Sequence, residues 1–148
     1  MLCYFMKEEF LTMRPHVILA SLILALGLTV VLLFAPSHAA AAACVSEGTE
    51  SWSGGFTCDG SPDQTPTSSD TVTILSGHTI TVDTGAQSDA LTVDAGATLD
   101  IPAGYSLTAY GDLTVHGDLS GEGDVYFYGT GTQTITGAGS WTGTGTFY

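Results

Sequence analysis

The feature of this sequence that most constrains its fold is a run of four hexapeptides in its second half. From Leu107 to Thr130 the chain reads LTAYGD, LTVHGD, LSGEGD and VYFYGT, with glycine at the fifth position of each hexapeptide. Most of them contain a short apolar–polar alternation, which is the period of a strand with one buried face. Three hexapeptides, or eighteen residues, are long enough for one circuit of a three-faced coil. The run therefore predicts a solenoid whose stacked coils bury their inward side chains against one another.

The same alternation extends over residues 70–148, and no segment there has the period of an amphipathic helix. Val72, Leu91, Leu107 and Val125 are spaced by 19, 16 and 18 residues, which we interpret as coils of near-equal length. We therefore predict an all-β protein, a single-stranded parallel β-helix of about four coils, and we favour a right-handed coil. The predicted inward side chains are Val72, Ile74, Ile80, Val82, Leu91, Val93, Leu99, Ile101, Leu107, Leu113, Val115, Leu119, Val125, Phe127 and Ile135.

A β-sandwich or jelly roll is the competing interpretation, because short strands with turns every eight to twelve residues also occur in those folds. The hexapeptides and the near-constant spacing favour the solenoid. In that fold we expect Trp52 and Trp141 to close the two ends of the core.

The N-terminal segment is an export signal by its composition. Residues 17–34 are uninterruptedly apolar, Arg14 precedes them, and the alanine-rich APSHAAAAAC follows. A basic start, an apolar centre and small residues at a cleavage site are the parts of a secretory signal peptide. A retained membrane-anchor helix is the alternative, because about eighteen apolar residues reach the lower limit for spanning a bilayer. Either interpretation predicts an extracellular or cell-surface domain.

Two cysteines, Cys44 and Cys58, lie beyond the apolar segment. In an oxidising compartment we expect them to form a disulfide, which would contribute on the order of 3 kcal/mol in the chain-entropy account. Lipidation of Cys44 is the alternative and excludes the disulfide, but Ala41 stands where a lipobox usually has leucine. The predicted domains are a signal peptide or anchor (1–43), a disulfide-bearing cap and loop (44–69) and the solenoid (70–148).

Charge in the predicted domain has a single sign. Both basic residues, Lys7 and Arg14, precede it, and residues 44–148 contain thirteen carboxylates and no Lys or Arg. Such a surface repels the phosphates of nucleic acid and anionic lipid headgroups. We therefore expect no nucleic-acid partner, and membrane contact only through an uncleaved N-terminal segment.

Two phrases of the sequence resemble a known group of extracellular proteins. The segment WSGGF begins at Trp52, Pro66 follows in a short loop, and residues 70–83 read DTVTILSGHTITVD. This opening resembles that of G8-like and related bacterial extracellular parallel β-helix proteins, the pectate-lyase-like solenoids, and the phrase at residues 129–141 is similar to one in large bacterial surface β-helix proteins. The resemblance covers about residues 52–148. It implies a β-helix fold and indicates little about activity.

Modules of that kind usually continue into further coils, so the resemblance leaves two expectations for this chain. It is either a short stand-alone version or a fragment of a larger surface protein without separate activity. In both cases an open solenoid end presents unpaired strand edges, and we expect it to favour end-to-end stacking.

We predict no catalytic residues. Parallel β-helices often carry polysaccharide lyases, but such chemistry normally uses an Arg or Lys, which the domain lacks. Glycoside hydrolysis needs only two carboxylates and stays open, although Asp59, Asp112, Asp118 and Asp124 adjoin glycine, as is typical of turns. His78 and His116 are interpreted as structural or exposed.

We also predict no cofactor and no metal site. Aspartates are the ligands that calcium prefers, yet Asp112, Asp118 and Asp124 would lie on successive faces of the coil and point away from one another. Loose calcium binding stays open.

The aromatic residues suggest a ligand strip. If Phe127 points inward, Tyr126 and Tyr128 share the outer face, and Tyr110 lies one coil earlier. We predict a possible strip of Tyr110, Tyr126 and Tyr128 for a glycan or a neighbouring surface protein; the alternative is ordinary strand composition or a cover for the open end. The predicted function is a non-enzymatic secreted or cell-surface module with a structural or adhesion role, and a carbohydrate-binding or carbohydrate-active domain is the alternative.

Overall fold

The computed structural model describes residues 40–148. The signal or anchor helix predicted within residues 1–43 lies almost wholly outside this range. Within the described range the chain is all β, and it contains no helix long and apolar enough to cross a membrane. The strands are β1 (Ala43–Ser46), β2 (Glu50–Ser51), β3 (Phe56–Cys58), β4 (Ser61–Gln64), β5 (Thr71–Ile74), β6 (Thr79–Thr81), β7 (Ala86–Ser88), β8 (Leu91–Val93), β9 (Thr98–Ile101), β10 (Ser106–Ala109), β11 (Leu113–Val115), β12 (Asp118–Gly121), β13 (Asp124–Phe127), β14 (Ile135–Thr136) and β15 (Ser140–Trp141).

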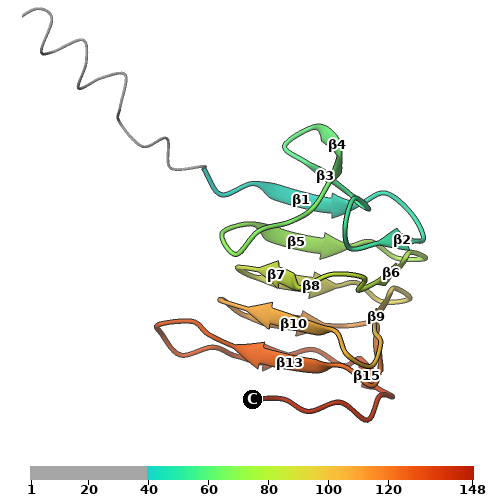
Figure 1. Ribbon diagram of the computed structural model, residues 1–148, viewed down its shortest axis with the longest axis vertical. Coiled ribbons are helices and arrows are strands. Elements are labelled where there is room, and N and C mark those ends of the chain that lie inside the picture. Colours follow the sequence, from blue (N-terminus) through green and yellow to red (C-terminus); the bar gives the residue numbers. More distant parts are fainter. Residues whose placement is uncertain (1–39) are drawn as a thin grey trace, which may run out of the picture. The chain divides into compact units, whose positions relative to one another are not determined.

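The strands form a three-faced parallel β-solenoid (Figure 1). One sheet has the order β14-β11-β8-β5-β1-β3-β4, the second β15-β12-β9-β6-β2 and the third β13-β10-β7. Three complete turns, each with one strand in every sheet, run from β5 to β13, and partial turns precede and follow them. The predicted solenoid is thus confirmed, with about three turns in place of the four expected.

The hexapeptides do form one circuit, because Leu107 pairs with Val125 eighteen residues later in parallel register. The predicted stacking of Leu107 on Leu91 is wrong. Leu91 pairs with Leu113, whereas Leu107 lies on another face and pairs with Ala86. All three faces carry the same alternation, so spacing alone does not distinguish a neighbour on the next face from a neighbour on the next coil.

The core is a narrow column of aliphatic side chains that repeat in every coil. Strands such as β8 and β11, both LTV, bury their outer two residues and leave the central threonine half-exposed. On the outside, Thr92 and Thr114 lie in register, as suits β-branched residues on a half-exposed pleated surface. Thirteen of the fifteen predicted inward side chains are buried.

The two exceptions lie toward the C-terminal end of the stack. Phe127 is half-buried, and Ile135 is 54% exposed. Ile135 does occupy the inward position in register with Leu113, so its predicted orientation follows the pattern. The prediction that Ile135 is buried was wrong, because no further coil covers this side chain in the described structure.

Glycine recurs in the hexapeptides because adjacent coils approach closely at the corners. A Cβ atom on Gly117 would lie 2.2 Å from the carbonyl oxygen of Ala97, one coil earlier. At Gly121 the backbone also has a φ of +96°, which L side chains rarely adopt, and a Cβ atom would lie 2.1 Å from the oxygen of Ile101. The repeat that predicts the coil is therefore also a steric requirement of stacking.

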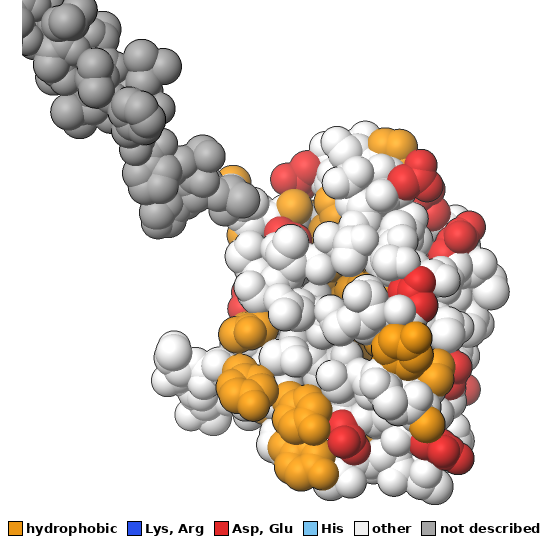
Figure 2. All heavy atoms as spheres, viewed as in Figure 1, with side chains coloured by type: hydrophobic (Ala, Val, Ile, Leu, Met, Phe, Trp, Pro, Cys, Tyr) orange, Lys and Arg blue, Asp and Glu red, His pale blue; other side chains and the backbone are white. Residues whose placement is uncertain are grey.

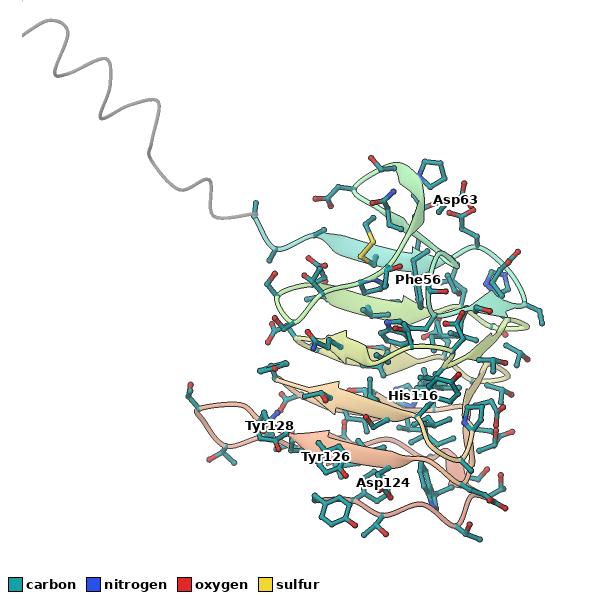
Figure 3. All side chains as sticks on the ribbon, in the orientation of Figure 1. Phe56, Asp63, His116, Asp124, Tyr126 and Tyr128 are labelled. Atoms are coloured by element: carbon teal, nitrogen blue, oxygen red, sulfur yellow. A yellow bond between two sulfur atoms is a disulfide. The ribbon has the colours of Figure 1, made fainter. Side chains whose placement is uncertain are left out.

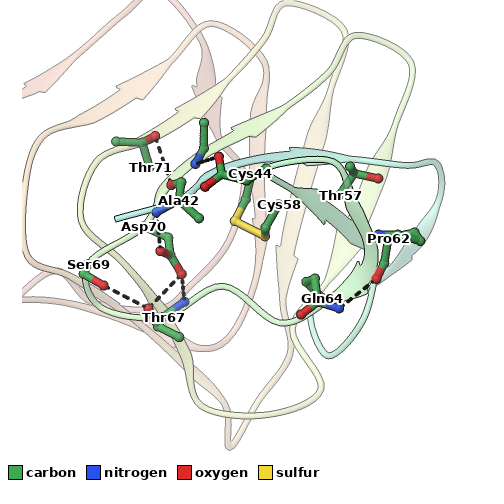
Figure 4. Close-up of a disulfide and its surroundings, with 12 residues drawn as sticks. Ala42, Cys44, Thr57, Cys58, Pro62, Gln64, Thr67, Ser69, Asp70 and Thr71 are labelled. Carbon is green, nitrogen blue, oxygen red and sulfur yellow. Dashed lines mark hydrogen bonds between the residues drawn. A yellow bond between two sulfur atoms is a disulfide. The ribbon is translucent and has the colours of Figure 1, made fainter. Parts of the chain in front are cut away.

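The N-terminal end of the stack is closed by a hairpin. Strands β1 and β2 add to two sheets by pairing parallel to β5 and β6, whereas β3 and β4 pair antiparallel beyond β1. The predicted disulfide is present: Cys44 of β1 is bonded to Cys58 of β3 (Figure 4). This bond leaves Cys44 no free thiol for lipidation. Beneath the hairpin, Trp52 is fully buried and packs edge-on against Phe56, with ring centroids 5.1 Å apart.

Two serines are buried in this apolar interior, and they differ in their hydrogen bonding. Ser46, on β1, accepts a hydrogen bond from the Leu75 N–H at 2.9 Å and its Oγ lies 2.7 Å from His78 Nδ1. Ser88, on β7, is fully buried and its hydroxyl has no partner. A buried hydroxyl without a partner opposes folding, whereas one with two partners supports it.

We therefore expect the two Ser→Ala substitutions to act in opposite directions. Ser88→Ala should raise the free energy of unfolding by about 1 kcal/mol, because it removes an unsatisfied polar group from an alanine-sized site. Ser46→Ala should lower it by about 1–3 kcal/mol, because it leaves the Leu75 N–H without an acceptor. Urea denaturation of both variants measures the two changes. Destabilisation by Ser88→Ala as large as that by Ser46→Ala would contradict this account.

Candidate functional site

The aspartates of the hexapeptides are hydrogen-bond acceptors for the next coil. Asp112 accepts the Thr134 N–H at 2.8 Å, and Asp124 accepts the Thr146 N–H at 2.9 Å. Asp118 accepts the Ser140 hydroxyl. In all three pairs the partner lies 22 residues later. The prediction of ordinary turn chemistry is thus too local: these side chains join one coil to another at three different corners.

Carboxylates of the earlier coils play the same part. Asp70 is only 7% exposed; it accepts the Ala42 N–H at 2.8 Å, and also the Thr67 N–H at 2.8 Å and the Thr67 hydroxyl at 2.7 Å. Asp83 accepts both the N–H and the hydroxyl of Ser53. Asp100 accepts the hydroxyl of Ser120 at 2.9 Å. We call these six residues, Asp70, Asp83, Asp100, Asp112, Asp118 and Asp124, the carboxylate clamps.

These hydrogen bonds favour the ionised form of three clamps. Burial opposes ionisation of Asp70, but the bonds from Ala42 and Thr67 outweigh it, and its pKa is lowered. The Ser53 hydroxyl lowers the pKa of Asp83, and the Thr134 N–H lowers that of Asp112. Asp70, Asp83 and Asp112 are therefore held in the ionised form, as acceptors and not as proton donors.

A metal or catalytic carboxylate pair would need these groups to converge. Asp112, Asp118 and Asp124 instead serve three successive corners, as the hexapeptide pattern predicts. Within residues 40–148 no group of three or more His, Cys, Asp or Glu side chains is placed to hold a metal ion.

The Ser46–His78 contact has the geometry of a nucleophile and its base, and sequence reasoning missed it because the two residues are 32 positions apart. Ser46 is only 2% exposed, and its oxygen already accepts the Leu75 N–H. A substrate carbonyl cannot reach that oxygen without opening the first coil. The contact therefore fastens the β1 strand to the next coil, and His78 has a structural role. His116 is exposed.

Tyrosines gather on the outside of β13. The Tyr126 ring stacks on Tyr148 with centroids 4.8 Å apart and lies 6.2 Å from Tyr128, which is 64% exposed (Figure 3). The Tyr126 hydroxyl also approaches Asp124 at 3.4 Å, and burial together with that carboxylate raises its pKa. Of the predicted strip, Tyr126 and Tyr128 are thus brought together, with Tyr148 as a third member; Tyr110 is 37% exposed and takes no part in these ring contacts.

An apolar hollow of about 260 Å³ opens at the C-terminal end of the stack. Its floor is formed by Val115 and Leu119 of the last complete turn, and its rim includes Ile135, Trp141 and Phe147. Trp141 and Phe147 pack together with centroids 4.7 Å apart. Trp141 therefore lies at the end of the core, as expected, but it covers the end only in part.

Comparisons of this chain with family models, with curated proteins and with solved structures found no match. The resemblance to G8-like and pectate-lyase-like β-helix proteins stays a prediction. The function is therefore inferred from the geometry of the chain itself.

The clamps predict a defined response to acid. Because the folded-state pKa of Asp70 lies below its ordinary value of 3.8, its contribution is present above that pH and is lost as the pH falls through the lower, folded-state pKa. Asp70→Asn places an amide N–H₂ against donors and should lower the free energy of unfolding at pH 7 by about 2–3 kcal/mol. Denaturant titrations at pH 7 and below pH 4 should show a smaller acid-induced loss in this variant than in the wild type.

The matched control is Glu122→Gln, which removes the same charge from an exposed side chain outside the clamps. We expect it to change stability by less than about 0.5 kcal/mol. Equal losses for Asp70→Asn and Glu122→Gln would show that net charge, and not the clamp, controls acid stability.

Proposed function

We propose that this chain is an exported, non-enzymatic β-solenoid whose role is structural or adhesive, at the cell surface or outside the cell. The observation that carries the proposal is the use of the carboxylates. Eight of the thirteen in the domain accept hydrogen bonds from backbone or hydroxyl donors: the six clamps, whose donors lie mostly on an adjacent coil, and Glu47 and Asp59, whose donors lie in the N-terminal strands and hairpin. These carboxylates are therefore committed to holding the stack and its hairpin together. A hydrolase of this composition would need two of them facing a common substrate.

Two further features support the same proposal. The Cys44–Cys58 disulfide suits an oxidising compartment, and the apolar run at residues 17–34 suits export. One outer face carries an in-register threonine row, Thr73, Thr92, Thr114 and Thr136, a regular surface suited to repeated contacts. A right-handed coil belongs to the proposal as well, because connections between parallel strands are right-handed in nearly all cases.

The proposal is tested with the full chain expressed in a host that has an export pathway. We expect the protein outside the cytoplasm, with Cys44 and Cys58 unreactive to an alkylating reagent until a reductant is added. Intact-mass measurement reads the disulfide, any lipid and the cleavage site together. Recovery of the protein in the cytoplasm with both thiols alkylated would refute export. Release of reducing ends or unsaturated products from a polysaccharide panel, with or without calcium, would refute the non-enzymatic role.

The tyrosine cluster favours glycan binding as a second candidate. Tyr128 presents an exposed ring, and Tyr126 and Asp124 add a hydroxyl and a carboxylate beside it. Aromatic faces with adjacent polar groups are a common surface for sugar rings. One face of Tyr126 is already covered by Tyr148, so Tyr128 is the ring on which a sugar would stack.

We expect glycan-array binding, if it uses this cluster, to weaken roughly 3- to 10-fold in Tyr128→Ala, since an aromatic contact contributes about 0.5–1.5 kcal/mol. The control is Tyr105→Ala, whose ring is 42% exposed and lies outside the cluster. Equal loss in both variants, or no glycan bound by the wild type, would remove this candidate.

A further inference from the structure

The two ends of the solenoid differ in how they are finished. At the N-terminal end the antiparallel β3–β4 hairpin extends one sheet past β1 and is fastened by the disulfide. This end also carries exposed carboxylates, Glu47, Glu50, Asp59 and Asp63. Asp63 donates its N–H to Glu47, which ties the hairpin to the β1–β2 turn. The end is therefore closed and negatively charged.

The C-terminal end has no such cover in the described structure. Strands β14 and β15 are the last strands of their sheets, and Phe147 bridges only to Val125 behind it. Each of the three faces thus ends in a backbone edge that is paired on one side. Ile135 and Phe147 are 54% and 38% exposed around the apolar hollow. Edges and exposed apolar side chains of this kind are templates for association.

The charge pattern changes in the last, partial coil. Residues 117–126 read GDLSGEGDVY, and residues 139–148, which are stacked on them, read GSWTGTGTFY. Asp118, Glu122 and Asp124 are thus replaced by Ser140, Thr144 and Thr146. No residue from 125 to 148 has a charged side chain, although residues 44–124 contain thirteen carboxylates. Figure 2 shows the largest hydrophobic cluster in view over the side of the last coils, with Asp and Glu side chains spread along the stack, some of them beside this cluster.

We propose that the C-terminal end of the solenoid, formed by β14, β15 and the Phe147 segment, is the contact surface for a second copy of this chain, joined tail to tail. Two copies carry the same strong negative charge and repel each other along their sides and at their capped ends. This end, which has no charged side chain in residues 125–148, is the part on which they can meet with the least repulsion, and each copy supplies there the apolar side chains that the other must cover.

The tail-to-tail arrangement follows from the cap. A head-to-tail contact would place this end against the acidic hairpin, and it would repeat without closing. A two-fold axis instead places identical edges against each other in antiparallel orientation, in which free strand edges can pair. Such a contact closes at two copies, and the last coil that each copy presents has no carboxylate side chain. The assembly is therefore a dimer and not a fibre.

The test is the mass of the exported full chain in solution, measured by light scattering or sedimentation over a range of concentrations. We expect a monomer–dimer equilibrium with no larger species. Ile135→Asp and Thr136→Asp, both at exposed positions of β14, should weaken dimerisation at least about tenfold by placing like charges across the axis. Leu75→Asp, an exposed apolar residue of an earlier coil, should leave it unchanged.

Salt gives an independent measurement. Because the copies repel each other, added NaCl should screen that repulsion and lower the dimer dissociation constant. A dimer held by ionic contacts would instead dissociate as salt is added. Circular dichroism and thermal melting check that each variant is folded. A monomer at all concentrations overturns the proposal, and so do a head-to-tail series of larger oligomers, a dimer unaffected by both β14 substitutions, or a dimer that dissociates as salt is added.

Discussion

Backbone pairing between coils is the interaction on which the rest of this structure depends. Among β5 to β15, paired residues are 18 to 22 positions apart, so an inward residue such as Leu113 must have an apolar counterpart in the coils before and after it. The same pairing brings the corners so close that a Cβ atom at Gly117 would overlap the Ala97 carbonyl. Glycine at the corners, aliphatic residues inside and threonine outside are three consequences of one spacing.

Asp100 and Asp118 bond the hydroxyls of their register partners within paired strands, whereas the other four carboxylate clamps act at strand ends and corners, where this pairing is interrupted. Between strands the backbone turns, and an N–H such as that of Thr134 or Thr146 receives a side-chain acceptor from the coil before it. Those two bonds are solvent-exposed, whereas the Ala42 and Thr67 N–H groups that Asp70 accepts are partly buried. A buried N–H without an acceptor opposes folding, so Asp70 stabilises the junction between its coil and the strand before it. The acidity of the domain is therefore partly structural, and the ionised state of Asp70 belongs to the folded state.

The sequence predicts the coil because the hexapeptides repeat with the period of the coil. It predicts the disulfide because only two cysteines lie in the domain. It misplaces Leu91 and Leu107 because corner insertions make the circuits unequal, and the three faces share one alternation. The burial of Ile135 depends on the coil beyond it, which no local pattern encodes. The Ser46–His78 contact joins unrelated turns and has no sequence signal. The clamps that bond the last coil did have a sequence signal. When residues 117–126 are aligned with residues 139–148, Asp118 pairs with Ser140 and Asp124 with Thr146.

The same alignment of the last two coils bears on how copies of the protein associate in solution. A solenoid exposes strand edges at its ends, and an exposed edge is a hazard for uncontrolled association. Here the β3–β4 hairpin extends one of the three sheets at the N-terminal end, where Trp52 and Phe56 fill the core, and carboxylates along the coils keep copies apart side by side. Ser140, Thr144 and Thr146 stand where the preceding coil has Asp118, Glu122 and Asp124, so the last coil of the described structure has neither a charged side chain nor a hairpin beyond it. A chain that removes charge only at its unpaired edge restricts self-association to that edge, and a single tail-to-tail contact then leaves the outer faces of both copies free.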